Sequence, residues 1–272
     1  MRLTRMFRIG REQKHNPEFP WYFRLFFGLF GAPEIGAKIR VSLVLEAIQD
    51  LSFSRLLDGS CGRGYLSFWL ARQHPHASIR GVDLNPERVA HNRATLKNLN
   101  LSNLTFDHAD LTHTLPGDDL YDAIITVDTL EHIDNDVAAL KRMREAMTDD
   151  GRLIILVPAD ASRHYHFFQK AADYVVPDHV RPGYSVEELQ DKLEKAGFIL
   201  VKSRYLYGYF ELYATQIGMV FSNRIVVYAL LLPMMVLTAC IPERWAPKVI
   251  TNSLLAIARP HLITSEHHEP TS

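Results

Sequence analysis

Residues 56–64 read Leu-Leu-Asp-Gly-Ser-Cys-Gly-Arg-Gly, a short apolar run that leads into a turn rich in small residues. A helical pattern begins directly afterwards at Tyr65. Glycines such as Gly59, Gly62 and Gly64 let a backbone approach a ligand closely, and the start of a helix offers free N–H groups to an anion. Many tight strand-to-helix turns contain glycine, so the residues that follow decide what this turn indicates.

Short β-type runs alternate with helical patterns along the rest of the chain, which predicts a largely parallel sheet flanked by helices. The expected strands are Arg55–Asp58, Ser78–Asp83, Leu104–His108, Tyr121–Val127, Arg152–Val157, Phe198–Tyr205 and Leu254–Ala258. The expected helices are Tyr65–Arg72, Pro86–Leu99, Val137–Met147 and a helix from the capping box at Ser185 to about Ala196. Asp150 and Gly151 are expected to form a turn before the fifth strand.

Four carboxylates fall at the ends of the first four strands in order. Asp58 precedes the glycine turn, and Asp83, Asp110 and Asp128 follow the next three strands. Parallel strands bring their carboxyl ends to one edge of a sheet, where ligands bind. A carboxylate such as Asp83 can accept hydrogen bonds from both hydroxyls of a ribose. Each acid alone could be a helix cap or a turn residue. Together they predict a nucleoside-binding pocket.

With these residues in order, the chain resembles the class I S-adenosylmethionine (SAM)-dependent methyltransferases over Arg55–Pro158, and more loosely beyond. The family's first motif, acid-x-Gly-x-Gly-x-Gly, is similar to Asp58–Gly64, except that Ser60 replaces the first glycine. Serine is small, but its backbone should avoid the conformations that glycine permits. Asp128–Ile133 and His179–Ser185 also resemble segments of the family's small-molecule branch. The resemblance implies a Rossmann-like α/β fold, a seven-stranded and mostly parallel sheet with helices on both faces.

The resemblance also implies SAM as the cofactor and a role for individual residues. Its methionine carboxylate would lie by the amides of Ser60–Gly64 and its ribose on Asp83. Its adenine would lie against Leu84 and Leu111, with Asp110 at its amino group. Asp128 and Thr129 would line the sulfonium end. The implied cofactor-binding residues are Asp58, Gly59, Ser60, Gly62, Gly64, Asp83, Leu84, Asp110, Leu111, Asp128 and Thr129. The positive sulfur makes the methyl group electrophilic, so transfer needs mainly alignment, which contributes up to roughly 7–11 kcal/mol.

A general base is needed only for an acceptor that holds its proton, such as an alcohol or a phenol. His132 and His179 are the candidates for this role, and His164 and His166 lie in the segment after the fifth strand. Each of these histidines could equally have a structural or surface role. No metal site is predicted, because the His164-x-His166 pair lacks a matching acidic or cysteine cluster.

The chain is expected to have five parts. They are a basic and aromatic segment with a lid helix (1–52), the SAM-binding core (53–206), an apolar helical insertion (207–252), the last strand (253–263) and a loose tail (264–272).

The aromatic patch Phe19–Phe30 could pack as a lid or lie on an anionic membrane surface. Ile225–Pro242 carries no charge and is expected to form a helical flap or membrane-dipping hairpin, broken at Pro233. A single membrane crossing is the alternative, since the length is at the lower limit for a span. These apolar segments point to a small, lipophilic acceptor and to peripheral membrane contact.

The formal net charge is −1, which gives no reason to expect a nucleic-acid partner. The two cysteines, Cys61 and Cys240, are far apart and indicate a reducing location, the cytoplasm or the inner face of the membrane. Two other functions remain open. A nicotinamide-dependent oxidoreductase would need Gly-x-Gly-x-x-Gly, which Asp58–Gly64 does not match. A non-catalytic nucleoside-binding or membrane-associated protein would bind the nucleoside without transferring a methyl group.

Overall fold

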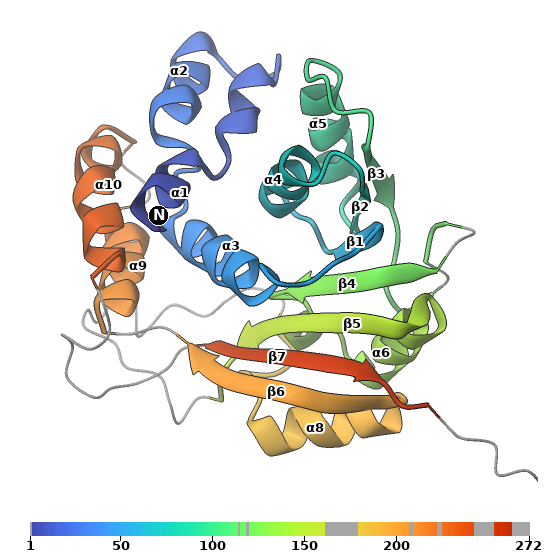
Figure 1. The fold of residues 1–272 in the computed structure, drawn as a ribbon. Helices are drawn as coiled ribbons and strands as arrows, with labels where there is room; N and C mark the ends of the chain where they lie inside the picture. The colour runs from blue at the N-terminus through green and yellow to red at the C-terminus, as the bar shows by residue number, and fades with distance from the viewer. Residues whose placement is uncertain are drawn as a thin grey trace, which may run out of the picture.

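The computed structural model describes residues 2–113, 115–117, 120–160, 179–206, 209–221, 225–241 and 253–262. Within these residues, a seven-stranded sheet has the strand order β3-β2-β1-β4-β5-β7-β6 (Figure 1). The strands are β1 (Arg55–Gly59), β2 (Ser78–Asp83), β3 (Leu104–His108), β4 (Tyr121–Val127), β5 (Met147–Pro158), β6 (Phe198–Leu206) and β7 (Ser253–Pro260). β1 to β5 pair in parallel, and β7 lies antiparallel between β5 and β6. The predicted Rossmann-like, mostly parallel sheet is confirmed.

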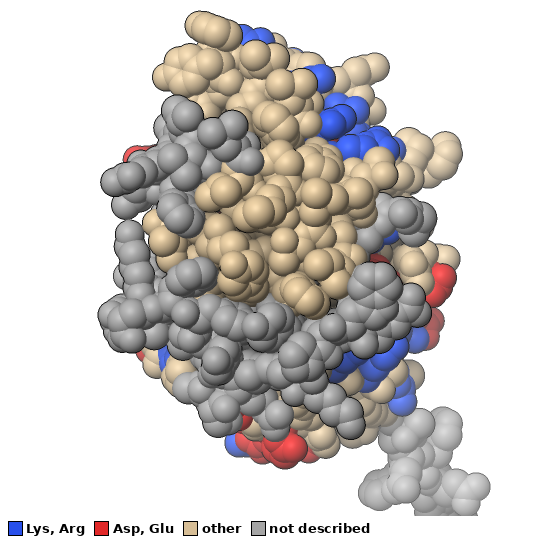
Figure 2. Space-filling view, turned by 90° about the vertical axis from the view of Figure 1, so that its left-hand side faces the viewer, with Lys and Arg blue, Asp and Glu red and all other residues tan. Residues whose placement is uncertain are grey.

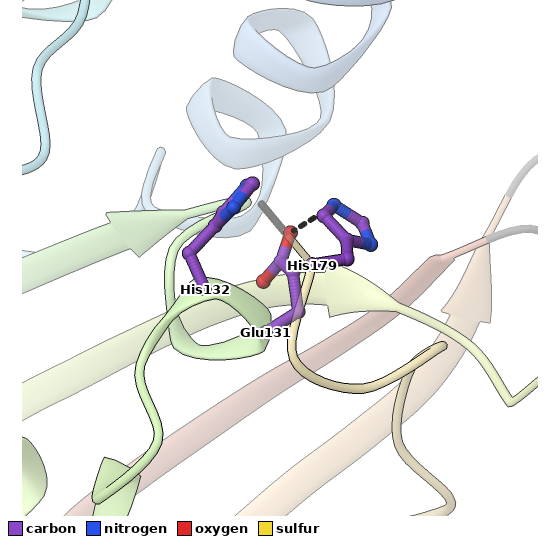
Figure 3. A group of neighbouring side chains, drawn as sticks. All are labelled: Glu131, His132 and His179. Carbon is purple, nitrogen blue, oxygen red and sulfur yellow. Dashed lines mark ion pairs between the residues drawn. The ribbon is translucent and has the colours of Figure 1, made fainter. Parts of the chain in front are cut away.

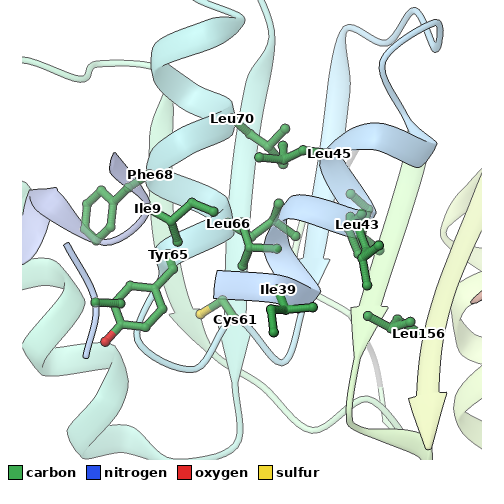
Figure 4. Packing of buried hydrophobic residues seen from close by; sticks show 14 of the residues in the cluster. Ile9, Ile39, Leu43, Leu45, Cys61, Tyr65, Leu66, Phe68, Leu70 and Leu156 are labelled. Atoms are coloured by element: carbon green, nitrogen blue, oxygen red, sulfur yellow. The ribbon is translucent and has the colours of Figure 1, made fainter. Parts of the chain in front are cut away.

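Helices cover both faces of the sheet, as predicted (Figure 1). Successive strand residues point to opposite faces, so Leu56 and Ile125 join one buried cluster while Leu57 and Ile124 join the other. The first cluster packs against α3 (Ile35–Ala47) and α4 (Tyr65–Gln73), as Figure 4 shows, with α5 (Pro86–Leu96) beside them. The second packs against α6 (Asp136–Glu145) and α8 (Val186–Lys195). Both strand faces are therefore apolar, as a buried parallel sheet requires.

Local signals set the starts of the helices more reliably than their ends. Asn85 caps α5 by accepting hydrogen bonds from two backbone amides, and the Ser185 side chain accepts from Glu188 N at 3.1 Å at the start of α8. The predicted helix over Pro86–Leu99 ends earlier, at Leu96. The predicted helix over 137–147 likewise ends at Glu145.

The predicted turn at Asp150 and Gly151 is wrong, because both residues lie within β5. The pairing of β5 with β4 shifts register between Tyr121 and Ala123. The extra β5 residues form a bulge there, so the strand continues through a turn-prone pair. Tertiary pairing with β4 therefore overrides the local preference.

The N-terminal segment and the apolar insertion pack together on one side of the sheet (Figure 1). The N-terminal elements are α1 (Arg2–Arg8), η1 (Arg11–His15) and α2 (Trp21–Phe30), followed by α3. The insertion forms α9 (Tyr209–Phe221) and α10 (Ile225–Ala239). Buried side chains from α1, α3, α9 and α10 join a single cluster. The insertion is therefore part of the folded body.

The predicted break at Pro233 is wrong, because α10 runs through this residue. Leu232, Met235 and Val236 are buried on either side of it, and their packing holds the helix across the hydrogen bond that proline cannot make. Among the described residues, no helix is long and apolar enough to cross a membrane. The predicted tail 264–272, together with His164 and His166, lies outside the described residues.

Candidate cofactor and acceptor site

A cavity of about 580 Å³ lies at the carboxyl ends of β1 and β4, between the glycine turn, α3 and the start of α5. Asp58, Ser60 and Gly62 line it on the side of the turn, and Asp128 and His132 line it after β4. Five residues that the sequence singled out therefore share one cavity. Gly59, Gly64, Asp83, Leu84, Asp110, Leu111, Thr129 and His179 are not among its lining residues.

The glycine turn adopts left-handed backbone conformations at three positions, with φ of 73° at Ser60, 54° at Gly62 and 71° at Gly64. The expectation that Ser60 avoids such conformations is wrong. The turn from β1 towards α4 has a positive φ at this position, and the backbone of Ser60 is strained as a result. A Cβ at Gly64 would lie 2.9 Å from Phe68 Cε2, whereas one at Gly62 would meet nothing within 4 Å. Gly64 is thus required by packing, while Gly62 leaves open space.

Asp83 holds the turn in place. Its Oδ2 accepts a hydrogen bond from Gly62 N at 2.8 Å, and its Oδ1 accepts from Asn85 N at 2.9 Å. The side chain is almost fully buried. A carboxylate offers about four lone-pair positions, so two remain after these bonds. The contact between Asp83 and the ribose stays a prediction. The structure adds a second role for Asp83, which is to anchor the turn.

Asp58 is a buried carboxyl group beneath the turn. Burial raises the pKa of Asp58 to about 7, and the negative charge of Asp83 acts in the same direction. Ser67 Oγ donates a hydrogen bond to Asp58 Oδ2 at 2.5 Å and opposes the shift. A carboxyl group that is partly protonated near neutral pH repels an anionic ligand group less than a full charge would.

The residues predicted to contact adenine lie outside the cavity. Leu84 is 64% exposed, and Leu111 is buried beside Gly59. Asp110 Oδ1 accepts hydrogen bonds from Thr112 N at 2.8 Å and Thr112 Oγ1 at 2.7 Å. These bonds lower the pKa of Asp110 and keep it ionised. The adenine contacts stay predictions.

At the other end of the cavity, Asp128 pairs with a residue that the sequence did not single out. Asp128 Oδ2 lies 2.5 Å from Nε of Arg40, a residue of α3. The backbone φ of Asp128 is 47°. Thr129 is turned inward, with its Oγ1 donating to Val127 O at 3.0 Å. Asp128 therefore faces the cavity as half of an ion pair, while Thr129 stabilises the backbone of the segment after β4.

Hydrogen bonds link the N-terminal segment to the glycine turn and to α5. Gln13 Nε2 donates to Arg63 O at 2.7 Å, and Gln13 Oε1 lies 2.9 Å from His91 Nε2. Asn16 Nδ2 donates to His91 O at 3.1 Å. Among the cavity residues that sequence reasoning missed, Arg40 comes from α3 and His91 from α5. They depend on long-range packing, and no spacing along the chain could have identified them.

Glu131, His132 and His179 form a cluster beside the cavity (Figure 3). Glu131 and His132 belong to η2 (Leu130–His132), whereas His179 comes from a distant part of the chain. The rings of the two histidines meet edge to face, with their centroids 4.5 Å apart. Burial raises the pKa of Glu131 to about 8, and Asp128 adds to the shift, while nearby backbone amides and Arg40 oppose it.

The segment that carries His179 is held by a buried ionic network. Val180 N donates to Glu131 O at 2.9 Å, and Arg181 Nη2 donates to Ile133 O at 2.9 Å. Arg181 and Tyr184 both bond to the carboxylate of Asp136, the Tyr184 hydroxyl at 2.8 Å. The stretch 179–185, which the sequence singled out, therefore fixes His179 next to η2.

Comparison with known proteins agrees with this geometry. A family model described as a methyltransferase domain matches residues 36–203. An (S)-coclaurine N-methyltransferase from Thalictrum flavum subsp. glaucum is 26% identical over 172 residues, 63% of this chain and 44% of that protein. The chain thus spans less than half the length of this relative.

Two solved structures share the fold. Coclaurine N-methyltransferase bound to N-methylheliamine and SAH has a TM-score of 0.59 at 17% identity, over 85% of this chain and 73% of that one. The [4+2]-cyclase SpnF has a TM-score of 0.58 at 19% identity, over 83% and 82% of the two chains. The family match, the strand order and the position of the cavity lead to one conclusion: the chain belongs to the class I SAM-dependent methyltransferase family.

Proposed function

We propose that this protein transfers a methyl group from SAM to a small, lipophilic acceptor. The observation that carries the proposal is the cavity of about 580 Å³ that joins the glycine turn to Asp128 and His132. This volume lies within the range of roughly 300–1,000 Å³ that is typical of small-molecule sites. The nicotinamide alternative has no comparable support, since the turn lacks the required glycine spacing.

The residues of the cavity fit the proposed cofactor. The left-handed turn and the open space at Gly62 allow a ligand to approach the backbone closely. SAM supplies an electrophilic methyl group on a positive sulfur, so the protein has mainly to align the two reactants. Asp128 and Arg40 line the far end of the cavity as an ion pair, which fixes the position of the carboxylate there. In the proposed arrangement this end receives the sulfonium and the acceptor.

Binding of the cofactor can be tested on the purified chain. We expect S-adenosylhomocysteine, the demethylated product, to raise the melting temperature while NAD leaves it unchanged, because a ligand stabilises only the state that binds it. Transfer of labelled methyl groups from SAM to a panel of lipophilic amines, phenols and alcohols then tests catalysis. A stabilising effect of NAD, or no effect of either compound on the folded chain, would contradict the proposal.

The lipophilic character of the acceptor is inferred from exposed apolar side chains of α2 and α10. α10 contacts both α2 and α3, and α3 lines the cavity. Trp21, Leu25 and Leu29 of α2 are 75%, 54% and 54% exposed, and Leu237 of α10 is 55% exposed. In Figure 2 the central surface is largely uncharged, with lysine and arginine side chains beside it. Exposed aromatic and aliphatic side chains next to basic residues are typical of helices that lie on an anionic membrane. We infer that this surface rests on such a membrane and receives the acceptor there.

Co-sedimentation with vesicles tests the membrane contact. We expect the chain to bind phosphatidylglycerol vesicles more strongly than phosphatidylcholine vesicles, and the double variant Leu25→Glu/Leu29→Glu to lose this binding. Val201→Glu is the matched control, because Val201 is equally exposed, at 55%, on β6. Equal binding of the double variant and the control would contradict the membrane contact and leave the methyl transfer proposal standing. His132 and His179 stay candidates for acceptor contact, and their possible role as a base stays a prediction.

A further inference from the structure

Glu131 is a buried carboxylate that lacks a hydrogen-bonded counter-charge among the described residues. Its side chain is 0% exposed, and within the described part of the chain neither carboxylate oxygen has a hydrogen-bond partner. His179 Nε2 lies 3.9 Å from Oε1, beyond hydrogen-bond distance. Although Arg40 and nearby backbone amides favour its charged form, a buried carboxylate whose oxygens lack hydrogen-bond partners is costly unless a proton or a cation also neutralises it. The group therefore has unused capacity to bind a cation.

The two histidines place their rings around this carboxylate (Figure 3). One possible ligand atom from each of Glu131, His132 and His179 lies within 4.8 Å of the other two. Ligand atoms around a tetrahedral zinc ion, with bonds of about 2.0–2.2 Å, lie about 3.4 Å apart. Small side-chain rotations would close this difference. Two imidazoles and one carboxylate are also a donor set used at catalytic zinc sites.

The surroundings hold the three side chains in this arrangement. Val180 N bonds to the carbonyl of Glu131, which ties the segment of His179 to η2. Arg181 and Tyr184 anchor the same segment on Asp136. Metal ligands are commonly oriented by such outer hydrogen bonds. The convergence of the three side chains thus rests on a fixed framework.

We propose that Glu131, His132 and His179 bind a divalent transition-metal cation of the zinc type at the acceptor end of the cavity. His132 lines the cavity, so a cation here would keep an open coordination position towards the acceptor space. A coordinated hydroxyl group loses its proton to water more easily, which leaves an oxygen anion ready to accept a methyl group. In this arrangement the histidines are ligands, and no histidine base is needed. This catalytic role rests on the proposed function, whereas cation binding does not.

Titration of the untagged, EDTA-treated full chain with Zn²⁺ in a calorimeter tests the site. We expect about one high-affinity equivalent, and at least tenfold weaker binding in Glu131→Gln and in His179→Ala, because each loses a ligand. His76→Ala is the control, since His76 is exposed and lies outside the cluster, and its affinity should match the unmodified chain. Co²⁺ provides a second readout, because its visible absorption changes on tetrahedral coordination.

Two outcomes would overturn the cation site. One is no zinc binding to the folded, unmodified chain. The other is binding that persists in both cluster variants, which would assign it to surface histidines. If Glu131→Gln does not fold, loss of the Co²⁺ absorption in His179→Ala alone decides the matter. S-adenosylhomocysteine should still stabilise His179→Ala, so failure of the cation site and failure of the proposed function give different results.

Discussion

The buried carboxylates near the two ends of the cavity differ in their hydrogen bonding. At the glycine turn, both oxygens of Asp83 accept backbone hydrogen bonds, and Asp58 accepts one from Ser67. At the other end, neither oxygen of Glu131 has a hydrogen-bond partner among the described residues. The turn is therefore organised before any ligand binds. Within the described part of the chain, Glu131 has no such hydrogen bonds, and this difference separates a preformed binding site from one that a ligand or cation would complete.

The most severe test of the preformed end is Gly64→Ala. The new Cβ would lie 2.9 Å from Phe68 Cε2 at a φ of 71°. The left-handed backbone costs roughly 1–2 kcal/mol and overpacking about 1–3 kcal/mol more, so we expect a loss of about 2–5 kcal/mol in the free energy of unfolding. Urea denaturation measures it. Gly62→Ala, with open space around its Cβ, should lose only the backbone part, and equal losses would show that packing at Gly64 is not decisive.

Asp83→Ala tests whether the bonded carboxylate also determines cofactor affinity. Hydrogen bonds to charged groups contribute about 1.5–3 kcal/mol each. If the energy of one such bond is lost from binding, the affinity for S-adenosylhomocysteine should fall roughly 10- to 150-fold. Calorimetry measures this change. Asp122→Ala is a matched control, because Asp122 Oδ2 accepts from Ser54 N at 2.8 Å and Arg55 N at 2.9 Å at the opposite end of β1. If both variants bind S-adenosylhomocysteine with equal affinity, Asp83 does not determine cofactor affinity.

Lys38 sharpens the comparison, because it is a buried charge that has polar partners. Its ammonium group donates to Met6 O at 2.8 Å and to Phe30 O. Lys38→Met leaves these carbonyls without that donor and should lower the free energy of unfolding by roughly 1–3 kcal/mol at neutral pH. Chemical denaturation provides the measurement. An unchanged stability would mean that the two carbonyls find other donors.

The pH dependence of stability gives a second measurement on Lys38. Burial lowers the pKa of Lys38 from 10.5 to about 7, with a smaller opposing effect from Glu34. Between these values the unfolded chain holds a proton that the folded chain lacks. The contribution of Lys38 to the free energy of unfolding should therefore rise with pH from about 7 to about 10.5. Denaturation curves across this range should show the rise, and Lys38→Met should lack it. Parallel curves for the two proteins would contradict the shift.

The smallest expected effect is at Ser60, where the preformed turn contains strain. Ser60→Gly should relieve the left-handed backbone at a φ of 73°. Relief of roughly 1–2 kcal/mol, offset by the greater freedom of glycine in the unfolded chain, leaves a net gain of about 0.5–1 kcal/mol. Thermal denaturation with and without S-adenosylhomocysteine tests this. A less stable variant would show that the Ser60 side chain contributes more than its backbone costs.

Much of the core could be predicted from the sequence, because its signals are local. Each predicted strand is present, and Pro86 and Ser185 mark the starts of α5 and α8 as expected. The alternation of strands and helices, and the glycine turn behind Asp58, are properties of neighbouring residues. They survive in any context that buries the apolar side chains. For this reason the order of residues along the chain is enough to reveal the resemblance to the family.

The errors occur where distant packing overrides a local preference. Asp150 and Gly151 lie within β5 because β4 pairs with Met147 and Arg152 on either side of them. α10 continues through Pro233 because its neighbours are buried. Ser60 adopts a glycine conformation because the turn between β1 and α4 requires it. In each case the residue's own preference amounts to about 1–3 kcal/mol, which burial of several side chains can exceed.

By itself, the sequence determined the α/β class, the order of the strands along the chain and the row of acids behind the glycine turn. Only the tertiary structure decided which side chains share the cavity, such as Arg40 beside Asp128, and which histidine joins Glu131. The physical reason is the distance along the chain between the residues that interact. Strands, turns and caps follow from contacts within a few residues, whereas a site that joins η2 to His179 depends on how the whole sheet brings separate segments together.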